Sequence, residues 1–165
     1  MPEVALVSIT PELAEELARP GELELRRGLH LGDSRALVAE VVAQTEAQRR
    51  AAGADPEWGG YLAVDAATRE VVGSCAFKGA PDAAGAVEIA YFTFPAFERH
   101  GFATAMARAL ERHATASHRV RVLVAHTLPE ENASTRVLRK LGFARAGEAS
   151  DPEVGRVWRW ERRLA

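Results

Sequence analysis

The sequence predicts a single α/β domain, built on a mixed, mostly antiparallel sheet with one parallel strand pair. Its 165 residues are the size of one domain, and 47% of them are apolar, enough to form a core. Strand-like and helix-like segments alternate in the middle of the chain, which favours a parallel pair. Short strand–turn–strand segments on either side of that middle favour antiparallel pairs. We expect residues 1–165 to form this one domain.

The N-terminal part predicts a strand and two helices. An apolar run at 4–9 is the first strand, and Thr10 with Pro11 forms a helix cap and first turn. Residues 21–32 hold three glycines and mixed charge, so we expect them to be irregular. Apolar residues at helical spacing predict a second helix over 34–52.

The middle of the chain predicts a hairpin and a strong strand. Residues 61–64 and 71–77 are its two strands, joined by a polar turn. The run VEIAYFTF at 87–94 has the clearest strand pattern in the chain, and Pro95 ends it.

The C-terminal part alternates again between helices and strands. The period changes to 3.6 from Gly101, which predicts a long helix. A second helix over 134–141 is closed by Gly142. The remaining strands are 120–125, 143–147 and 154–161.

Composition excludes several classes of protein. The single cysteine, Cys75, allows neither an intramolecular disulfide nor a cysteine-based zinc site. No signal peptide or membrane-spanning run is present, so we expect a cytoplasmic protein without a membrane partner. A formal net charge of −2 argues against a nucleic-acid partner.

That small net charge conceals a division within the chain. Residues 1–95 carry 8 basic and 15 acidic side chains, a net of −7, whereas 96–165 carry 13 and 8, a net of +5. A basic second half in an acidic protein indicates a local site for an anion.

The segment FTFPAFERHGFATA at 92–105 is the best candidate for that site. A strand ends, Arg99, His100 and Gly101 follow in a short loop, and a helix begins. Unpaired N–H groups at a helix start bind phosphate groups, and glycine permits close approach. An ordinary strand–helix turn is the alternative interpretation. The usual dinucleotide and phosphate-loop motifs are absent from the sequence.

Two stretches resemble signatures of the GNAT N-acetyltransferase superfamily. VEIAYFTFPAFERHGFATAMARAL (87–110) is similar to its central strand–loop–helix motif. ENASTRVLRKLGF (131–143) is similar to its second signature, and most resembles the branch that includes ribosomal-protein N-terminal acetyltransferases.

The resemblance implies that acetyl-CoA lies between splayed fourth and fifth strands, with helices on both faces of the sheet. His113 and His118 are five residues apart and cannot share a helical face, so we expect no metal site. Its pantetheine arm would follow the fourth strand, its pyrophosphate the loop, and its thiol end a polar pair on the next helix. The matching cofactor-binding residues are Phe92, Thr93, Phe94, Arg99, His100, Gly101, Phe102, Ala103, Thr104, Asn132 and Ser134.

Transfer to an amine requires a base, and Glu88 is the first candidate because it matches a glutamate often found on that strand. The alternative is a surface carboxylate in an ion pair. His126 is the second candidate, or otherwise a loop histidine. Leu138 stands where relatives often have a Tyr that acts as the general acid, so Ser134 or water would protonate the departing CoA thiolate. Ser134 is equally suited to cap its helix.

We therefore expect an acyl-CoA-dependent N-acetyltransferase, acting on a small primary amine or a protein N-terminus by direct attack in a ternary complex. Segments 19–32 and 148–155 would shape the acceptor site, and Trp58 would line it or pack in the core. The alternative is a catalytically degenerate acyl-CoA-binding sensor or structural subunit, because Glu98 and Asn132 depart from the family pattern. Either a monomer or a homodimer is expected.

Overall fold

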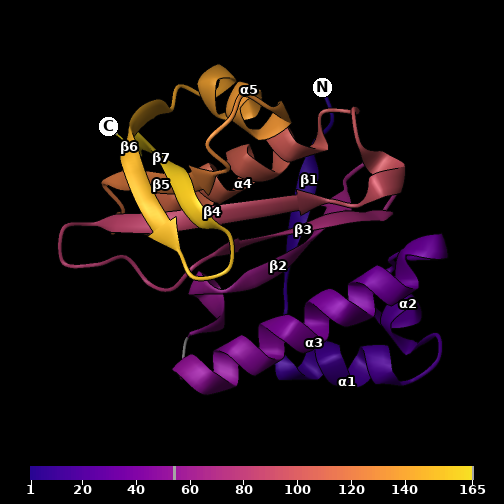
Figure 1. Ribbon diagram of the computed structural model, residues 1–165. Coiled ribbons are helices and arrows are strands. Elements are labelled where there is room, and N and C mark those ends of the chain that lie inside the picture. The colour runs from indigo at the N-terminus through magenta and orange to yellow at the C-terminus, as the bar shows by residue number, and fades with distance from the viewer. Residues whose placement is uncertain (54, 165) are drawn as a thin grey trace.

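A seven-stranded sheet forms the centre of the computed structural model, which describes residues 1–53 and 55–164. The strand order is β1-β2-β3-β4-β5-β7-β6 (Figure 1). The strands are β1 (Val4–Ser8), β2 (Gly60–Asp65), β3 (Val71–Phe77), β4 (Ala86–Thr93), β5 (Val122–Thr127), β6 (Ala144–Asp151) and β7 (Gly155–Arg163). The helices are α1 (Pro11–Ala18), α2 (Glu22–Arg27), α3 (Arg35–Ala52), α4 (Phe102–Ser117) and α5 (Ala133–Lys140). Short 3₁₀ helices connect them at η1 (Gly32–Ser34), η2 (Pro56–Trp58) and η3 (Pro95–Phe97).

β4 and β5 form the parallel pair, whereas the other neighbouring strands in the described part of the chain run antiparallel. The predicted α/β class with one parallel pair is thereby confirmed. Pairing of β4 with β5 covers only residues 86–88 against 122–124, and it stops where Glu88 lies opposite Val124. β4 continues to Thr93 and β5 to Thr127 without pairing further, so an opening forms between them. We call this opening the splay.

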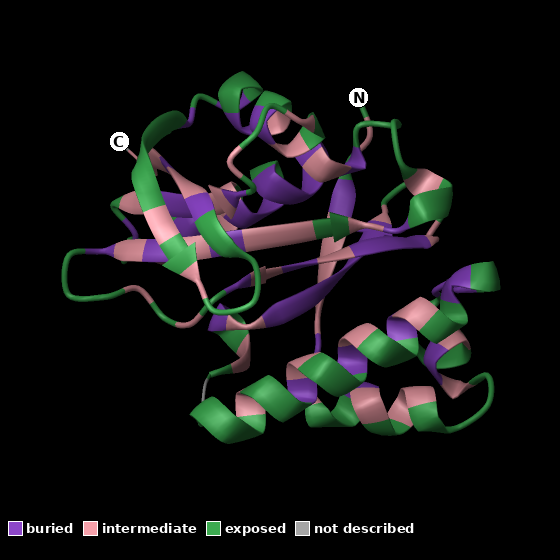
Figure 2. Ribbon diagram, in the orientation of Figure 1, coloured by how far each residue is buried: buried purple, intermediate pink, exposed green. Residues whose placement is uncertain are grey.

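Helices cover both faces of the sheet and enclose two separate cores. Figure 1 shows α1, α2 and α3 against one face and α4 and α5 against the other. The larger core joins α4 and α5 to β2–β5, and the smaller joins α1–α3 to the opposite side of β2 and β3. In Figure 2, the buried positions of α3 and α4 accordingly lie on the sides that face the sheet.

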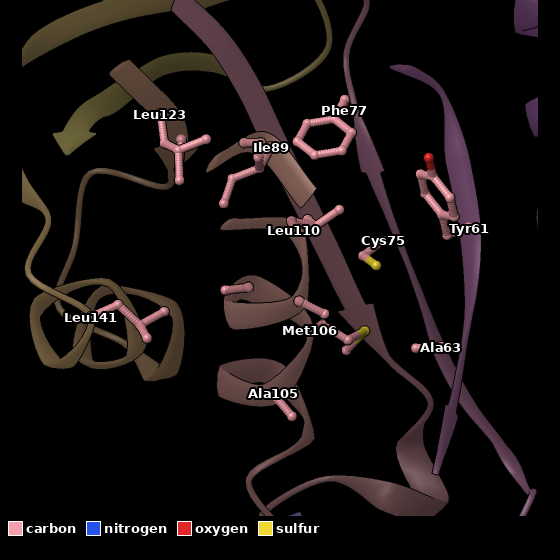
Figure 3. Close-up of a cluster of buried hydrophobic side chains, with 14 of the residues drawn as sticks. Tyr61, Ala63, Cys75, Phe77, Ile89, Ala105, Met106, Leu110, Leu123 and Leu141 are labelled. Atoms are coloured by element: carbon pink, nitrogen blue, oxygen red, sulfur yellow. The ribbon is translucent and has the colours of Figure 1, made fainter. Parts of the chain in front are cut away.

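α4 forms because its apolar residues recur at helical spacing. Phe102, Met106 and Leu110 are four residues apart, so they share one face. Figure 3 shows Met106 and Leu110 directed toward Cys75 and Ile89 of the sheet. Met106 and Leu110 are fully buried, and burying a side chain of this kind contributes about 1.5–3 kcal/mol. The helix is therefore fixed on β3 and β4, which holds its N-terminus beside the end of β4.

The segment 21–32, predicted to be irregular, contains the short helix α2. Gly21 and Gly28 flank it with left-handed backbone angles, so they start and stop the helix. Leu23 is fully buried in the smaller core, and Glu22 pairs with Arg26 one turn later. The glycines therefore mark the two ends of this helix in the sequence, but the helix itself is recognised only from its packing in the structure.

The strands β5 and β6 also differ from their predicted bounds. β5 begins two residues late because Arg121 and Val122 both donate their N–H groups to the Gly85 carbonyl in a turn. β6 extends to Asp151, but it is an edge strand whose side chains are mostly exposed. An edge strand of this kind has no alternation of apolar residues from which its length can be predicted.

Among the residues that the structure describes, no helix combines the length and the apolar character needed to cross a membrane.

Candidate active site

The splay opens into a cavity of about 250 Å³, which we call the splay cavity. Its walls come from the residue that follows β3, from β4, β5 and α5, and from the hairpin of β6 and β7. The lining residues are Lys78, Glu88, Ile89, Ala90, Tyr91, Ala125, His126, Thr127, Leu128, Ser134, Leu138, Asp151, Val154 and Val157. The three residues proposed from the sequence for catalysis are therefore brought together in one cavity.

Glu88 forms two polar contacts at the point where the strands separate. Its Oε2 lies 2.9 Å from His126 Nδ1 and 3.3 Å from Lys78 Nζ. An ionised carboxylate only accepts hydrogen bonds, so Nδ1 is the protonated nitrogen of His126. About a quarter of each of the Glu88 and His126 side chains is exposed. The carboxylate is thus accessible, and it is held in place from two sides.

Asp151 adds a second carboxylate to this cavity from the end of β6. The backbone N–H groups of Glu153 and Val154 donate to its Oδ1 and hold the pKa of Asp151 below its ordinary value. The charges of Lys78 and His126 lower that pKa further. Asp151 is therefore ionised at neutral pH, and it lines the same cavity as Lys78 and Glu88.

Ser134 and Asn132 occupy different environments on α5. The Asn132 side chain accepts from the Thr135 N–H at 3.0 Å, and Thr135 Oγ1 accepts from the Asn132 N–H at 3.0 Å. This capping box gives Asn132 the helix-cap role considered for Ser134. Ser134 lines the splay cavity, as does the buried Leu138 one turn later, whereas Asn132 does not line it.

The loop between β4 and α4 has the backbone form of an anion site. Arg99 and Gly101 take left-handed conformations at φ 64° and 84°, and Gly101 is the N-cap of α4. Arg99 thus adopts a conformation that usually favours glycine. Arg99 and His100 are exposed, and the first hydrogen bond of the helix runs from the Ala105 N–H to the Gly101 carbonyl.

The first turn of α4 therefore leaves the N–H groups of Phe102, Ala103 and Thr104 available to a ligand. The Phe102 and Thr104 side chains are buried in the protein, so Thr104 is available through its backbone rather than its hydroxyl. A Cβ on Gly101 would lie 3.3 Å from the Pro2 ring, so the start of the chain lies beside this loop.

The end of β4 presents alternate backbone groups to the splay. The Glu88 carbonyl accepts a hydrogen bond from the N–H of Lys78, which directly follows β3. The Phe94 N–H donates to the carbonyl of Val72, which lies in β3. Because successive residues of a strand direct these groups to opposite sides, the groups of even-numbered residues, including Phe92, face β3. The backbone N–H and C=O groups of Thr93 therefore face the splay, whereas those of Phe92 and Phe94 face β3.

Ile89 and Tyr91 join Thr93 on that open edge, although neither was proposed from the sequence. The alternation of backbone groups along β4 identifies both residues once the pairing of β3 with β4 is known. Burial also raises the pKa of the Tyr91 hydroxyl to about 12, so this residue is neutral at physiological pH.

A second cavity, of about 770 Å³, lies between α3 and the sheet; we call it the α3 groove. Its floor is made of small residues, Gly60, Ser74, Ala76 and Ala90. A Cβ at position 60 would lie 2.7 Å from Thr45 Cγ2, so glycine keeps this floor open below α3. Lys78 and Ala90 line both cavities, which therefore adjoin.

The sequence-predicted acceptor segments contribute unequally. Asp151 and Val154 of segment 148–155 line the splay cavity, whereas no residue of 19–32 lines either cavity in the described part of the chain. Trp58 packs edge-on against Phe77 in the core, as one of its two interpretations predicted, and it also lines the α3 groove.

The family model for the acetyltransferase (GNAT) domain matches residues 6–144. An acetyl transferase from Salmonella typhimurium, which modifies the N-terminal serine of 50S ribosomal subunit protein L7/L12, is similar in structure. It has a TM-score of 0.67 at 17% identity, over 99% of this chain and 96% of that one. The ribosomal-protein-S5-alanine acetyltransferase from Vibrio fischeri has a TM-score of 0.62 at 14% identity, over 97% of this chain and 91% of that one.

A ribosomal L7/L12 alpha-N-protein acetyltransferase solved in complex with coenzyme A gives a TM-score of 0.62 at 18% identity, over 99% of this chain and 93% of that one. At these identities the likeness extends to the fold, and the family assignment rests on the family model. No curated protein matches the chain significantly in sequence.

Proposed function

Because the chain belongs to the GNAT family of acetyltransferases, we propose that it moves an acetyl group from acetyl-CoA to a primary amine by direct attack, with both substrates bound together. One observation carries the proposal. Glu88 and His126 meet at the point where β4 and β5 separate, inside the cavity that Ser134 also lines.

The residues of the splay suit acetyl-CoA, which supplies a thioester at one end of an extended arm and a pyrophosphate further along it. The free backbone groups of Ile89, Tyr91 and Thr93 are suited to hydrogen bonds with the amides of that arm. The free N–H groups in the first turn of α4, with Arg99 beside them, are suited to the pyrophosphate. These two sites are consecutive in the chain, as one continuous ligand requires.

Glu88 is the proposed base. A protonated amine cannot attack a carbonyl carbon, so the acceptor must first lose a proton. Glu88 accepts that proton directly or through water, while His126 holds the carboxylate by its Nδ1–H. His126 is thus a positioning residue in this scheme. Backbone N–H groups on the open edge of β4 stabilise the oxyanion, and Ser134 or water protonates the departing thiolate.

The acceptor approaches along the α3 groove in this proposal, because that groove adjoins the splay cavity at Lys78 and Ala90. Glu40 and Asp55 on its walls are suited to a cationic amine, and they share the lining with the cations Arg49 and Lys78. Three similar proteins are named for ribosomal proteins, and two of these names specify the N-terminal serine or the alpha-amino group. We therefore propose a protein N-terminus as the first acceptor class to test, beside small amines.

The test is to incubate the protein with acetyl-CoA and a panel of small amines and peptides, and to measure thiol release and the CoA-induced rise in melting temperature. We expect stabilisation by CoA and acceptor-dependent thiol release. Stabilisation by CoA without thiol release in the presence of any acceptor would favour the alternative, a catalytically degenerate acyl-CoA-binding protein. That alternative is supported by Leu138, which lines the cavity where relatives often have a Tyr as general acid. Absence of both responses would contradict the proposal.

A further inference from the structure

Lysine is rare in this chain, which has 19 arginines and only two lysines, Lys78 and Lys140. One of the two lies against the proposed base. We propose that Lys78 is an acetylation site, modified in cis by the protein's own active site. The inference rests on the proposed acetyl transfer and adds a substrate to it, namely the side chain of the enzyme itself.

The position of Lys78 is the first support. It directly follows β3, and its backbone N–H donates to the Glu88 carbonyl at 2.8 Å, which fixes its main chain beside β4. Its Nζ lies 3.3 Å from Glu88 Oε2. The amine that would react and the carboxylate that would deprotonate it are therefore already in contact.

The surroundings of Lys78 are the second support. Its side chain lines the same splay cavity as Tyr91 and Ser134, where the thioester end of acetyl-CoA is proposed to lie. About half of the side chain (54%) is exposed, so it is free to change rotamer. In this proposal, rotation about the side-chain bonds brings Nζ to the thioester, and no movement of the strands is invoked.

The chemistry of the side chain is the third support. An arginine would form the same ion pair with Glu88, and arginine is the usual cation of this chain. A guanidinium, however, cannot be deprotonated in proteins, whereas a lysine amine loses its proton and becomes a nucleophile. Lysine at position 78 thus permits a reaction that arginine would prevent.

The transfer balances without any further reactant. Glu88 takes one proton from the Lys78 ammonium, and the Nζ lone pair then attacks the thioester carbonyl carbon of acetyl-CoA. As the tetrahedral intermediate collapses, the carbon–sulfur bond breaks, and the second proton lost by Nζ goes to the thiolate. The products are an amide at Lys78, free CoA thiol and one proton released from Glu88 to water.

Acetylation would change the electrostatics of the site. Lys78 is the cation shared by both cavities, and an amide carries no charge. Glu88 would keep its contact with His126 but lose its ion pair. The mouth of the site would thereby become more negative by one charge, which favours entry of a cationic acceptor.

The experiment is to incubate the full chain with acetyl-CoA carrying an isotopic label in the acetyl group, without added acceptor, and to locate the label by peptide mass spectrometry. We expect label at Lys78, with a first-order rate constant that does not depend on protein concentration. Glu88→Gln should slow labelling by about 10²-fold, the lower part of the range for general-base catalysis. Lys78→Arg should abolish labelling at that position.

Lys140 provides the matched control, because it lies at the end of α5 in a different groove, with Arg108, Arg112 and Arg162. Lys140→Arg should leave the labelling of Lys78 unchanged. Equal labelling of the two lysines, an unaltered rate in Glu88→Gln, or a rate that grows with protein concentration would each overturn the proposal. Thiol release to added amines without label at Lys78 would also overturn it, but would leave the transferase function standing. Absence of CoA binding and of thiol release would contradict both.

Discussion

Glu88 is restrained by two partners that contact the same oxygen. His126 and Lys78 both approach Oε2, at 2.9 and 3.3 Å. A carboxylate held in this way loses little rotamer freedom when it binds an acceptor ammonium, since its orientation is already set. At the scale of one residue, the site therefore depends on one carboxylate whose direction is fixed by a histidine and a lysine.

Replacing that carboxylate tests its role. We expect Glu88→Gln to lower kcat for amine acetylation by about 10²–10⁴-fold, because an amide of the same shape cannot accept the proton. His126→Ala should cost less, about tenfold, because it removes only the group that positions the base. Steady-state kinetics with a saturating acceptor measure both values.

Glu111→Gln is the control, since Glu111 is also a paired carboxylate, 2.5 Å from Arg162, but lies outside both cavities. Its kcat should remain close to that of the unaltered protein. A Glu88→Gln variant as active as Glu111→Gln would rule out Glu88 as the base.

The sequence identifies these residues singly but not their association. Glu88 and His126 each stood as an alternative base, and the structure joins them although they are 38 residues apart. Their contact depends on the register of β4 against β5, and no local pattern specifies that register. Lys78 carried no sequence signal except its rarity among arginines.

The N-terminus of α5 shows how one element is fixed beside the cavity. Asn132 and Thr135 exchange hydrogen bonds, and Glu131 adds a third contact to Thr135 Oγ1 at 3.1 Å. The helix has only eight residues, too few to be stable without tertiary contacts. Its cap therefore helps to hold Ser134 on the cavity wall.

Removing the cap should destabilise the protein. We expect Asn132→Ala to lower the free energy of unfolding by about 1 kcal/mol, the usual cost of losing an N-cap side chain. Urea unfolding followed by circular dichroism measures the change. Asn132→Asp, which keeps an acceptor oxygen for the Thr135 N–H, should retain most of the stability. Equal losses in the two variants would argue against the capping role.

Elements with strong periodicity were predictable, and those that depend on packing were not. β4 and α4 follow from an apolar run and a 3.6-residue repeat. α2 has six residues between two glycines, and its only fully buried side chain is Leu23. The splay itself follows from the family resemblance, whereas the backbone groups that it frees could be assigned only from the pairing of β3 with β4.

The two halves of opposite charge meet at the active site. The acidic half, residues 1–95, contributes Lys78 and Glu88 to the splay cavity, and the basic half contributes His126 and Ser134. The α3 groove belongs entirely to the acidic half, and the loop proposed to hold the pyrophosphate belongs to the basic half. In the proposed function, the acceptor groove therefore belongs to the acidic half and the pyrophosphate loop to the basic half, while the arm of acetyl-CoA follows β4 at the end of the acidic half.

Stability of the whole molecule should fall at alkaline pH. Burial raises the pKa of Cys75, Tyr61 and Tyr91 to about 12, from ordinary values of 9.0 for the thiol and 10.0 for the hydroxyls. Because the unfolded chain releases these protons first, their contribution is complete below about pH 9 and is lost as pH rises toward 12. Urea titrations at several pH values across this range should show a falling free energy of unfolding.

Tyr91→Phe isolates one of these groups, since the ring is kept and the titrating hydroxyl is removed. Its stability should decline less steeply above pH 10, the ordinary value for a tyrosine hydroxyl. Identical pH dependence in the two proteins would show that Tyr91 does not contribute.

The position of Pro2 beside Gly101 has a practical consequence for anyone who produces this protein. Residues placed ahead of Met1, whether a purification tag or the remnant of its cleavage site, would emerge next to the loop proposed to hold the pyrophosphate. The imidazole groups of a histidine tag there, which are partly protonated near neutral pH, would provide an artificial ligand for the same phosphate groups. Affinities for CoA are therefore best measured on protein that carries no N-terminal extension.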